Sequence, residues 1–172
     1  MKKLDESLLS GIPPFRRLTS PQIRTILDLA QPRRFDLGSA VFSEGMPVDR
    51  FYLLLDGHVR VVRTTAEGDQ IIVLHISSGQ LFGIGAALGH LTYPATAMTA
   101  GECLTLSWPS ALWPGFAANY DGFASETYKV VGSRMAEMTA RMVELATKQV
   151  EQRVASAMLR LITQNGRKVD LG

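Results

Sequence analysis

The strongest constraint on the fold is the regular spacing of glycines between residues 33 and 108. They separate short runs rich in β-branched and aromatic residues, and turn residues at intervals of about 8–12 positions are typical of β-sandwiches and barrels. The glycines are Gly38, Gly45, Gly57, Gly68, Gly79 and Gly101. The pattern therefore predicts an all-β core with strands over residues 33–37, 40–43, 50–56, 59–64, 71–76, 95–100 and 103–107.

Helical segments flank this core on both sides. Before it, Thr19 can cap a helix that has Pro21 just inside its start. The apolar residues that follow recur at helical spacing and are Ile23, Ile26, Leu27 and Ala30. They predict one short amphipathic helix. After the core, the residues Trp113-Pro114-Gly115 are expected to break the chain before a second helical region.

That second region, residues 124–145, carries apolar residues at alternating spacings of three and four. They are Tyr128, Val131, Met135, Met138, Met142 and Leu145. This is the a/d pattern of a coiled coil, so we predict a seam between two copies of the helix. The alternative is a helix that packs on its own β core.

A separate helix is expected over residues 150–163, after the polar residues 147–149 and before a glycine cap at Gly166. Its apolar face comprises Val150, Val154, Ala157, Met158, Leu161 and Ile162. No later element is evident that could cover this face, so the chain is expected to be cut short. The patterns divide it into N-terminal helices with a β-roll (1–118), a dimerisation helix (119–147) and a hinge with a further helix (148–172).

The stretch from Gln70 to Gly101 contains no Asp, Glu, Lys or Arg. A stretch of that length and average composition would hold about eight charged residues. Glycines stud its centre and apolar residues flank it, so we interpret it as the wall of a ligand pocket.

Composition excludes several classes of protein. The single Cys103 forbids an internal disulfide, and also a four-thiolate zinc or iron–sulfur site within one chain. No apolar run reaches the length of a membrane span, and Asp5 and Glu6 break any signal-peptide pattern, so a cytoplasmic location without membrane contact is expected. The pocket stretch holds no carboxylate and the chain lacks nucleophile, phosphate-loop and paired-histidine motifs, which predicts that the protein is not an enzyme.

The order of these segments, and three local motifs, resemble the superfamily of the cyclic-AMP receptor protein and the fumarate-nitrate regulator. The motifs are Val41-Phe42-Ser43-Glu44-Gly45, residues 51–61, and Gly79-Gln80-Leu81-Phe82-Gly83. The resemblance implies a mainly β fold with helices: a double-stranded β-helix, or jelly roll, like a cyclic-nucleotide-binding domain, followed by a long dimerisation helix.

It also implies a bacterial transcription regulator that works as a homodimer. In such regulators a helix-turn-helix domain follows the point at which this chain ends, so DNA and RNA polymerase are expected as partners only of a longer parent protein. Only the first helix of that domain would be present here.

Relatives that bind cyclic nucleotides carry a glutamate after Phe-Gly, for the ribose, and an arginine before a Ser/Thr-Ala pair, for the cyclic phosphate. The corresponding residues here are Ile84 and Pro94. A buried phosphate without a cation is very costly, so cyclic AMP and cyclic GMP are not expected.

The segment Tyr93-Pro94-Ala95-Thr96-Ala97 resembles the motif of denitrification regulators that respond to nitric oxide. This resemblance implies heme as the cofactor and control of nitrogen-oxide genes. The candidate iron ligands are His75, in a strand of the uncharged stretch, and His90, at the end of its glycine-rich centre. Each histidine could instead be an ordinary hydrogen-bonded residue. The protein could also be a regulator that binds a cyclic nucleotide or another small molecule, or a ligand-free dimerisation scaffold. The predicted pocket consists of Val73, Leu74, Ile76, Leu81, Phe82, Ile84, Leu88, Ala95, Thr96, Met138 and Thr139.

Overall fold

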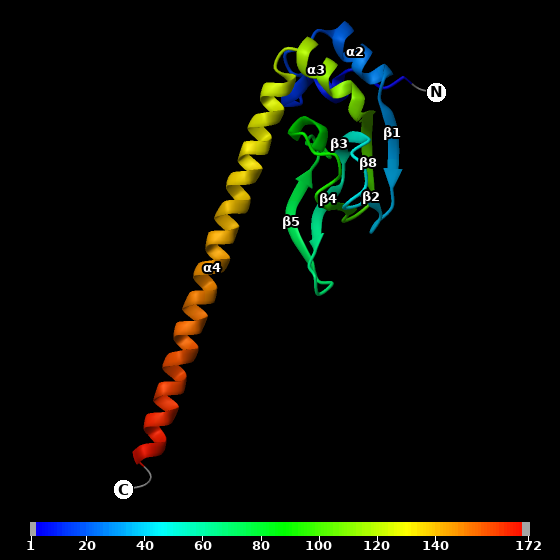
Figure 1. Cartoon of the computed structure of the whole chain (residues 1–172). Coiled ribbons are helices and arrows are strands. Elements are labelled where there is room, and N and C mark those ends of the chain that lie inside the picture. Colours follow the sequence, from blue (N-terminus) through cyan, green and yellow to red (C-terminus); the bar gives the residue numbers. More distant parts are fainter. Residues whose placement is uncertain (1–2, 170–172) are drawn as a thin grey trace. The chain divides into compact units, whose positions relative to one another are not determined.

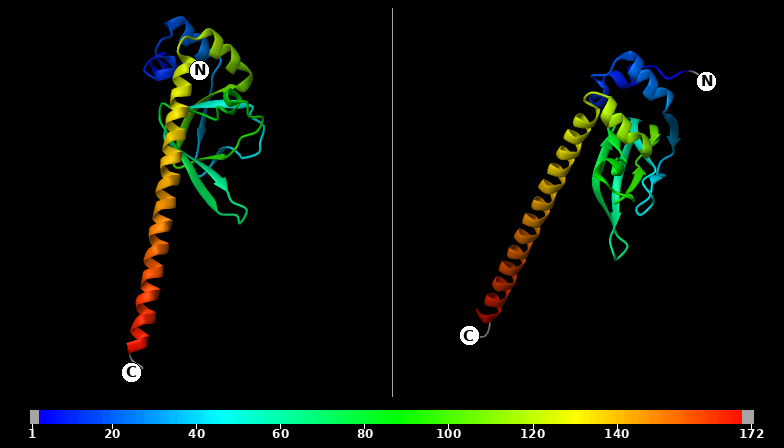
Figure 2. Two further views of the ribbon diagram at one scale, coloured as in Figure 1. Left: turned by 60° about the vertical axis from the view of Figure 1, so that its left-hand side comes forward. Right: turned by 45° about the horizontal axis from the view of Figure 1, so that its top comes forward.

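The computed structural model describes residues 3–169, with side chains for residues 3–163. The chain divides into two compact units, and the boundary in the sequence lies between Val131 and Gly132. The first contains the strands and the short helices, and the second is a helical segment (Figure 1, Figure 2). Among the described residues, no helix combines the length and the apolar character needed to cross a membrane.

Within the described residues, eight strands pair antiparallel in two four-stranded sheets, and several of these strands are labelled in Figure 1. The first sheet has the order β1 (Gln31–Phe35), β8 (Cys103–Pro109), β3 (Arg50–Asp56) and β6 (Leu81–Phe82). The second has the order β2 (Ala40–Phe42), β7 (Thr96–Thr99), β4 (His58–Thr64) and β5 (Gln70–Ser77). The predicted all-β core is therefore confirmed, and its strands pair in the antiparallel sense. Strand β6 was not predicted, because two residues are too few to carry an alternating pattern.

Side-chain alternation along β3 separates two hydrophobic cores. Phe51 and Leu53 belong to the core beneath the helices, whereas Tyr52 and Leu54 belong to the core between the two sheets. Successive side chains of a strand point to opposite faces, so one strand can serve both cores.

Short helices cover the first of these cores at one end of the roll (Figure 1). They are α1 (Ser7–Ser10), η1 (Pro13–Phe15), α2 (Ser20–Asp28), η3 (Ser110–Leu112) and α3 (Trp113–Asn119). The expected break at residues 113–115 is wrong: these residues form the first turn of α3, with Pro114 near its start. Proline is favoured there because its missing N–H would have no helical partner.

Helix α2 begins with the predicted cap. The Thr19 side chain accepts a hydrogen bond from the Gln22 amide, and the Gln22 side chain accepts one from the Thr19 amide. This capping box satisfies two amides that otherwise lack partners at a helix start.

Replacing Thr19 by Ala removes one of these acceptors. We expect Thr19→Ala to lower the free energy of unfolding by about 1 kcal/mol, as measured by urea denaturation. Thr19→Ser retains the hydroxyl and serves as the control, with a loss of less than about half that amount. An unchanged stability of Thr19→Ala would contradict the role of the cap.

Helix α4 runs without interruption from Phe123 to Val169. The expected break at residues 147–149 and the expected helix end before Gly166 are therefore wrong. Thr147, Lys148 and Gln149 are polar but compatible with a helix, and polarity alone does not end one. Gly166 itself lies within α4, so it does not cap a helix there.

Candidate functional site

The uncharged stretch folds into a compact cassette between β5 and β7. It contains β6, the single-turn helix η2 (Gly85–Leu88) and the loop that leads to β7. Gly79, Gly83 and Gly89 have φ angles of 83°, 65° and 75°, in the left-handed region that glycine adopts without strain. The glycines that punctuate the sequence here therefore mark turns of the cassette.

Four aromatic rings pack together beside the cassette backbone, and they belong to Phe42, Tyr52, Phe82 and Tyr93. The ring of Tyr93 stacks on Phe42 with a centroid distance of 3.9 Å, and Tyr52 stacks on Phe82 at 5.3 Å. A methyl group added at Gly83 would lie 2.9 Å from Phe42 and 3.0 Å from Tyr52. The rings therefore pack directly against the cassette backbone.

The Tyr93 hydroxyl links this aromatic cluster to the start of β3 by hydrogen bonds. It donates to the Arg50 carbonyl at 2.5 Å and lies 3.3 Å from a carboxylate oxygen of Asp49. Burial raises the pKa of both Tyr93 and Tyr52 above the ordinary tyrosine value. Both hydroxyls are therefore neutral at physiological pH and Tyr93 remains a hydrogen-bond donor.

Backbone hydrogen bonds join the cassette loop to the turn after β2. The Tyr93 amide donates to the Met46 carbonyl at 2.9 Å, and the Gly45 amide donates to the Tyr93 carbonyl at 2.8 Å. Nearby, the Val48 amide donates to the Leu91 carbonyl at 3.0 Å. The loop is thus held along its length rather than left free.

The predicted pocket residues are distributed over several places. Ile76 and Phe82 are buried between the sheets with Leu74 packed against them, whereas Leu81 and Ile84 belong to the core beneath the helices. Leu88 is 48% exposed. The remaining residues are Ala95, which is buried, Val73 and Thr96, which are half-buried, and Met138 and Thr139, which are exposed and lie in the second unit.

The two positions at which the resemblance implies charged ligands of a cyclic nucleotide carry uncharged side chains. Ile84 is 6% exposed within the hydrophobic core, and Pro94 is exposed. At the start of η2, where amides could hold a phosphate, a methyl group added at Gly85 would lie 3.0 Å from Val48. Neither Ile84 nor Pro94 offers a carboxylate to a ribose or a cation to a phosphate, and burial of a phosphate without a cation is costly.

The candidate iron ligands are both exposed. His75 lies on β5 between Leu74 and Ile76, which pack towards the inter-sheet core, so alternation places it on the outer face. His90 follows the left-handed Gly89. No cluster of three or more histidine, cysteine or acidic residues that could hold a metal ion occurs in the described part of the chain.

Cys103 is buried at the start of β8. Its Sγ lies 3.2 Å from the His58 carbonyl, and burial raises the pKa of its thiol. The thiol therefore stays protonated and serves as a small core residue.

Sequence reasoning missed Phe42 and Tyr52 as neighbours of the cassette. Tyr52 belongs to a predicted strand whose alternation indicates which residues share a face. The partner of that face, however, depends on how two sheets pack, and local sequence carries no signal for this.

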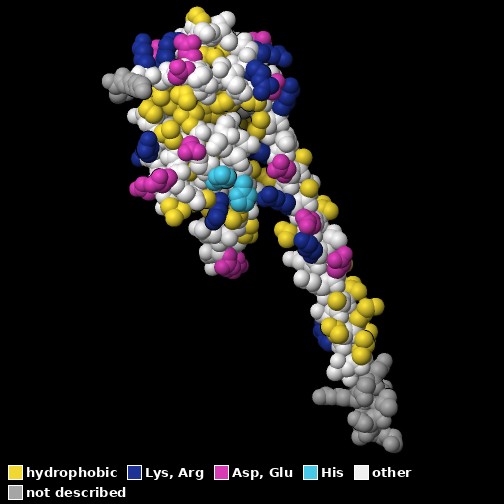
Figure 3. Space-filling model, turned by 180° about the vertical axis from the view of Figure 1, so that it is seen from behind, with side chains coloured by type: hydrophobic (Ala, Val, Ile, Leu, Met, Phe, Trp, Pro, Cys, Tyr) yellow, Lys and Arg dark blue, Asp and Glu magenta, His cyan; other side chains and the backbone are white. Residues whose placement is uncertain are grey.

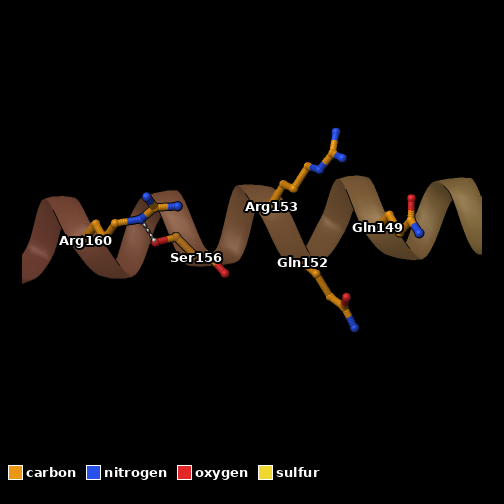
Figure 4. A pocket seen from close by; sticks show the side chains of 5 residues that line it. All are labelled: Gln149, Gln152, Arg153, Ser156 and Arg160. Carbon is orange, nitrogen blue, oxygen red and sulfur yellow. Dashed lines mark hydrogen bonds between the residues drawn. The ribbon is translucent and has the colours of Figure 1, made fainter. Parts of the chain in front are cut away.

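A shallow hollow of another kind occurs on α4 (Figure 4). It is lined only by polar residues of that helix, namely Gln149, Gln152, Arg153, Ser156 and Arg160. The Arg160 guanidinium donates to the Ser156 carbonyl at 3.3 Å. The hollow lacks the apolar walls of an effector site.

Two antiparallel sheets with a glycine-rich cassette, followed by a long helix, define a jelly-roll domain of the effector-binding class. Residues 32–120 match the family described as "Cyclic nucleotide-binding domain". This match spans more than half of the chain, and the chain belongs to that family.

Two relatives illustrate the range of proteins with similar sequences. A cAMP-dependent protein kinase regulatory subunit of Mycosarcoma maydis is 32% identical over 100 residues, which cover 58% of this chain and 19% of that protein. A CRP-like cAMP-activated global transcriptional regulator of Mycobacterium tuberculosis is 24% identical over 164 residues, which cover 95% of this chain and 72% of the regulator.

Solved structures support the same fold. The sensor domain of the transcriptional regulator DNR from Pseudomonas aeruginosa has a TM-score of 0.67 at 21% identity, covering 78% of this chain and 91% of that one. The Thermus thermophilus catabolite activator protein has a TM-score of 0.69 at 24% identity, covering 88% and 71%. The expected jelly roll followed by a long helix is confirmed, and the relatives support the superfamily of the cyclic-AMP receptor protein and the fumarate-nitrate regulator.

Proposed function

We propose that the chain is the effector-sensing and dimerisation portion of a bacterial transcription regulator, and that its effector is apolar rather than a cyclic nucleotide. The observation that carries this proposal is the cassette itself: Ile84 and Pro94 stand where a carboxylate and a cation would be needed, and residues 70–101 contain no charge. The chain is a binding module and has no catalytic role in this proposal.

The finer proposal is heme-dependent sensing of nitric oxide, with control of denitrification genes. Heme suits an uncharged wall because it has a large apolar face and needs only one or two axial ligands. His75 and His90 are the candidate ligands. Because both are exposed, a heme held by either would lie at the surface of the roll and not between the sheets.

Homodimerisation through α4 is part of the proposal. Five of the predicted seam residues are exposed, and they are Tyr128, Met135, Met138, Met142 and Leu145. The sixth, Val131, packs against the core beneath the helices. Flexible methionines permit two packings of similar energy, so an effector that favours one could bias the seam. DNA and RNA polymerase would be partners of a longer parent protein, in the cytoplasm.

A ligand-free dimerisation scaffold is the second candidate. It is favoured by the aromatic packing against Gly83, where Phe42 and Tyr52 fill the inner side of the cassette. Such a protein would bind neither heme nor a nucleotide.

Titration with hemin separates these candidates. We expect a stoichiometric Soret band that shifts on addition of nitric oxide and is lost in His75→Ala or in His90→Ala, with His58→Ala as the matched control. Cyclic AMP, added alone, should leave the thermal midpoint unchanged. Stoichiometric binding of cyclic AMP would overturn the apolar effector, and a protein that binds neither hemin nor nucleotide would favour the scaffold.

A further inference from the structure

The outer face of the β4–β5 ladder brings two histidines together. Strand register pairs His58 with Ser77 and Arg60 with His75. Positions two apart on a strand share a face, so these four residues lie on one face. The opposite face carries Val59 and other residues of the inter-sheet core.

His58 and His75 are diagonal neighbours on this face. Such neighbours have Cα atoms about 7–8 Å apart and Cβ atoms somewhat closer, within reach of long side chains. Both residues are exposed. The space-filling view shows histidine side chains gathered at one place on the surface (Figure 3).

Both imidazoles are available to a ligand. Among the residues that the structure describes, neither imidazole takes part in a hydrogen bond or an ion pair. The His58 carbonyl accepts from the Ala100 amide at 2.9 Å and lies 3.2 Å from Sγ of Cys103, which leaves the ring itself uninvolved. A positively charged side chain, Arg60, lies on the same face directly opposite His75. It is exposed and takes part in no ion pair within the described residues.

Neutral imidazole nitrogen is a preferred ligand of Zn²⁺, Ni²⁺ and Cu²⁺. A Zn–N bond is about 2.0–2.1 Å long, so two ring nitrogens that converge from diagonal positions can hold one ion. Two protein ligands leave the other coordination positions to water. The resulting site is open and labile, unlike a closed structural zinc site.

We propose that His58 and His75 together bind a divalent transition-metal ion, such as Zn²⁺, on the outer face of the β4–β5 ladder. The site shares His75 with the heme proposal, but it differs from that proposal because it also needs His58. The bound ion cross-links two neighbouring strands, and it stabilises the fold by mass action because the unfolded chain does not hold the two rings together.

Calorimetric titration of the whole chain with Zn²⁺ tests this proposal. We expect one ion per chain, and at least a tenfold loss of affinity in His58→Ala and in His75→Ala. His90→Ala is the matched control, since it removes an exposed histidine elsewhere, and its affinity should stay within twofold. The thermal midpoints of the metal-free variants, expected to be unchanged, show that these proteins are folded.

Substitution of Arg60 provides a second, independent test of the metal site. Its charge opposes a bound cation at a distance of several ångströms, so Arg60→Gln should raise the Zn²⁺ affinity about two- to fivefold at low salt. Affinity within threefold of the original in both His58→Ala and His75→Ala would overturn the proposal. So would an equal loss in His90→Ala. The heme proposal predicts dependence on His75 or His90 without His58, so the two can fail separately.

Discussion

Trp108→Ala is expected to lower the free energy of unfolding by about 4 kcal/mol. Trp108 is fully buried and stacks on Phe51 at a centroid distance of 5.4 Å. Its indole N–H donates to the Ile26 carbonyl at 2.8 Å. Truncation therefore leaves a large cavity beneath the helices and deprives a buried carbonyl of its partner.

Urea denaturation measures this loss as a lower midpoint with an unchanged slope. Trp108→Phe separates the two contributions, because it keeps most of the packing and loses the hydrogen bond, with an expected cost of about 1–2 kcal/mol. Leu37→Ala removes an exposed leucine and should cost less than about 0.5 kcal/mol. A loss below about 1 kcal/mol for Trp108→Ala would show that this residue does not anchor the core.

Gly57→Ala is expected to lower the free energy of unfolding by about 3 kcal/mol, the second largest loss predicted for this protein. Gly57 has a φ of 101°, and a methyl group there would lie 2.5 Å from the Glu102 carbonyl oxygen and 2.7 Å from Sγ of Cys103. Both strain and a clash with backbone oppose the substitution. Because Gly57 joins β3 to β4, a shift here would disturb the junction of the two sheets.

Gly68→Ala is the matched control for that prediction. Its φ of 92° is also positive, but no atom lies within 4 Å of the added methyl group. This variant therefore suffers backbone strain alone, worth about 1–2 kcal/mol. Equal losses for Gly57→Ala and Gly68→Ala in urea denaturation would mean that the close approach of Glu102 has no energetic weight.

Features of the fold that depend on local pattern could be predicted from the sequence. Alternation located seven of the eight strands, and the hydroxyl of Thr19 located the start of α2. The polarity of residues 147–149 was interpreted as a break, but α4 continues through them. Polar residues are also normal on the solvent-facing side of a helix, so polarity alone does not distinguish a break from an exposed turn. Pro114 was ambiguous because proline both ends helices and begins them.

At the candidate site, too, some features could be predicted from the sequence and others could not. The missing charges could be read from the sequence, and Ile84 and Pro94 could be placed by resemblance. The aromatic packing of Phe42 against Tyr93, and the shared face of His58 and His75, depend on sheet packing and strand register. The first is a relation between distant segments, and the second depends on the register of a hairpin; alternation within a single strand encodes neither.

The unbroken helix α4 has a mechanical consequence. Its first turns are anchored, with Phe123 and Thr127 buried and Val131 packed on the core, and it then continues to Val169. At about 1.5 Å per residue, the span beyond Val131 is roughly 57 Å long. A tilt of about 5° at the anchored end would move the far end by about 5 Å. Any small change in the direction of the first turns would therefore be amplified along a helix of this length to more than the diameter of a water molecule.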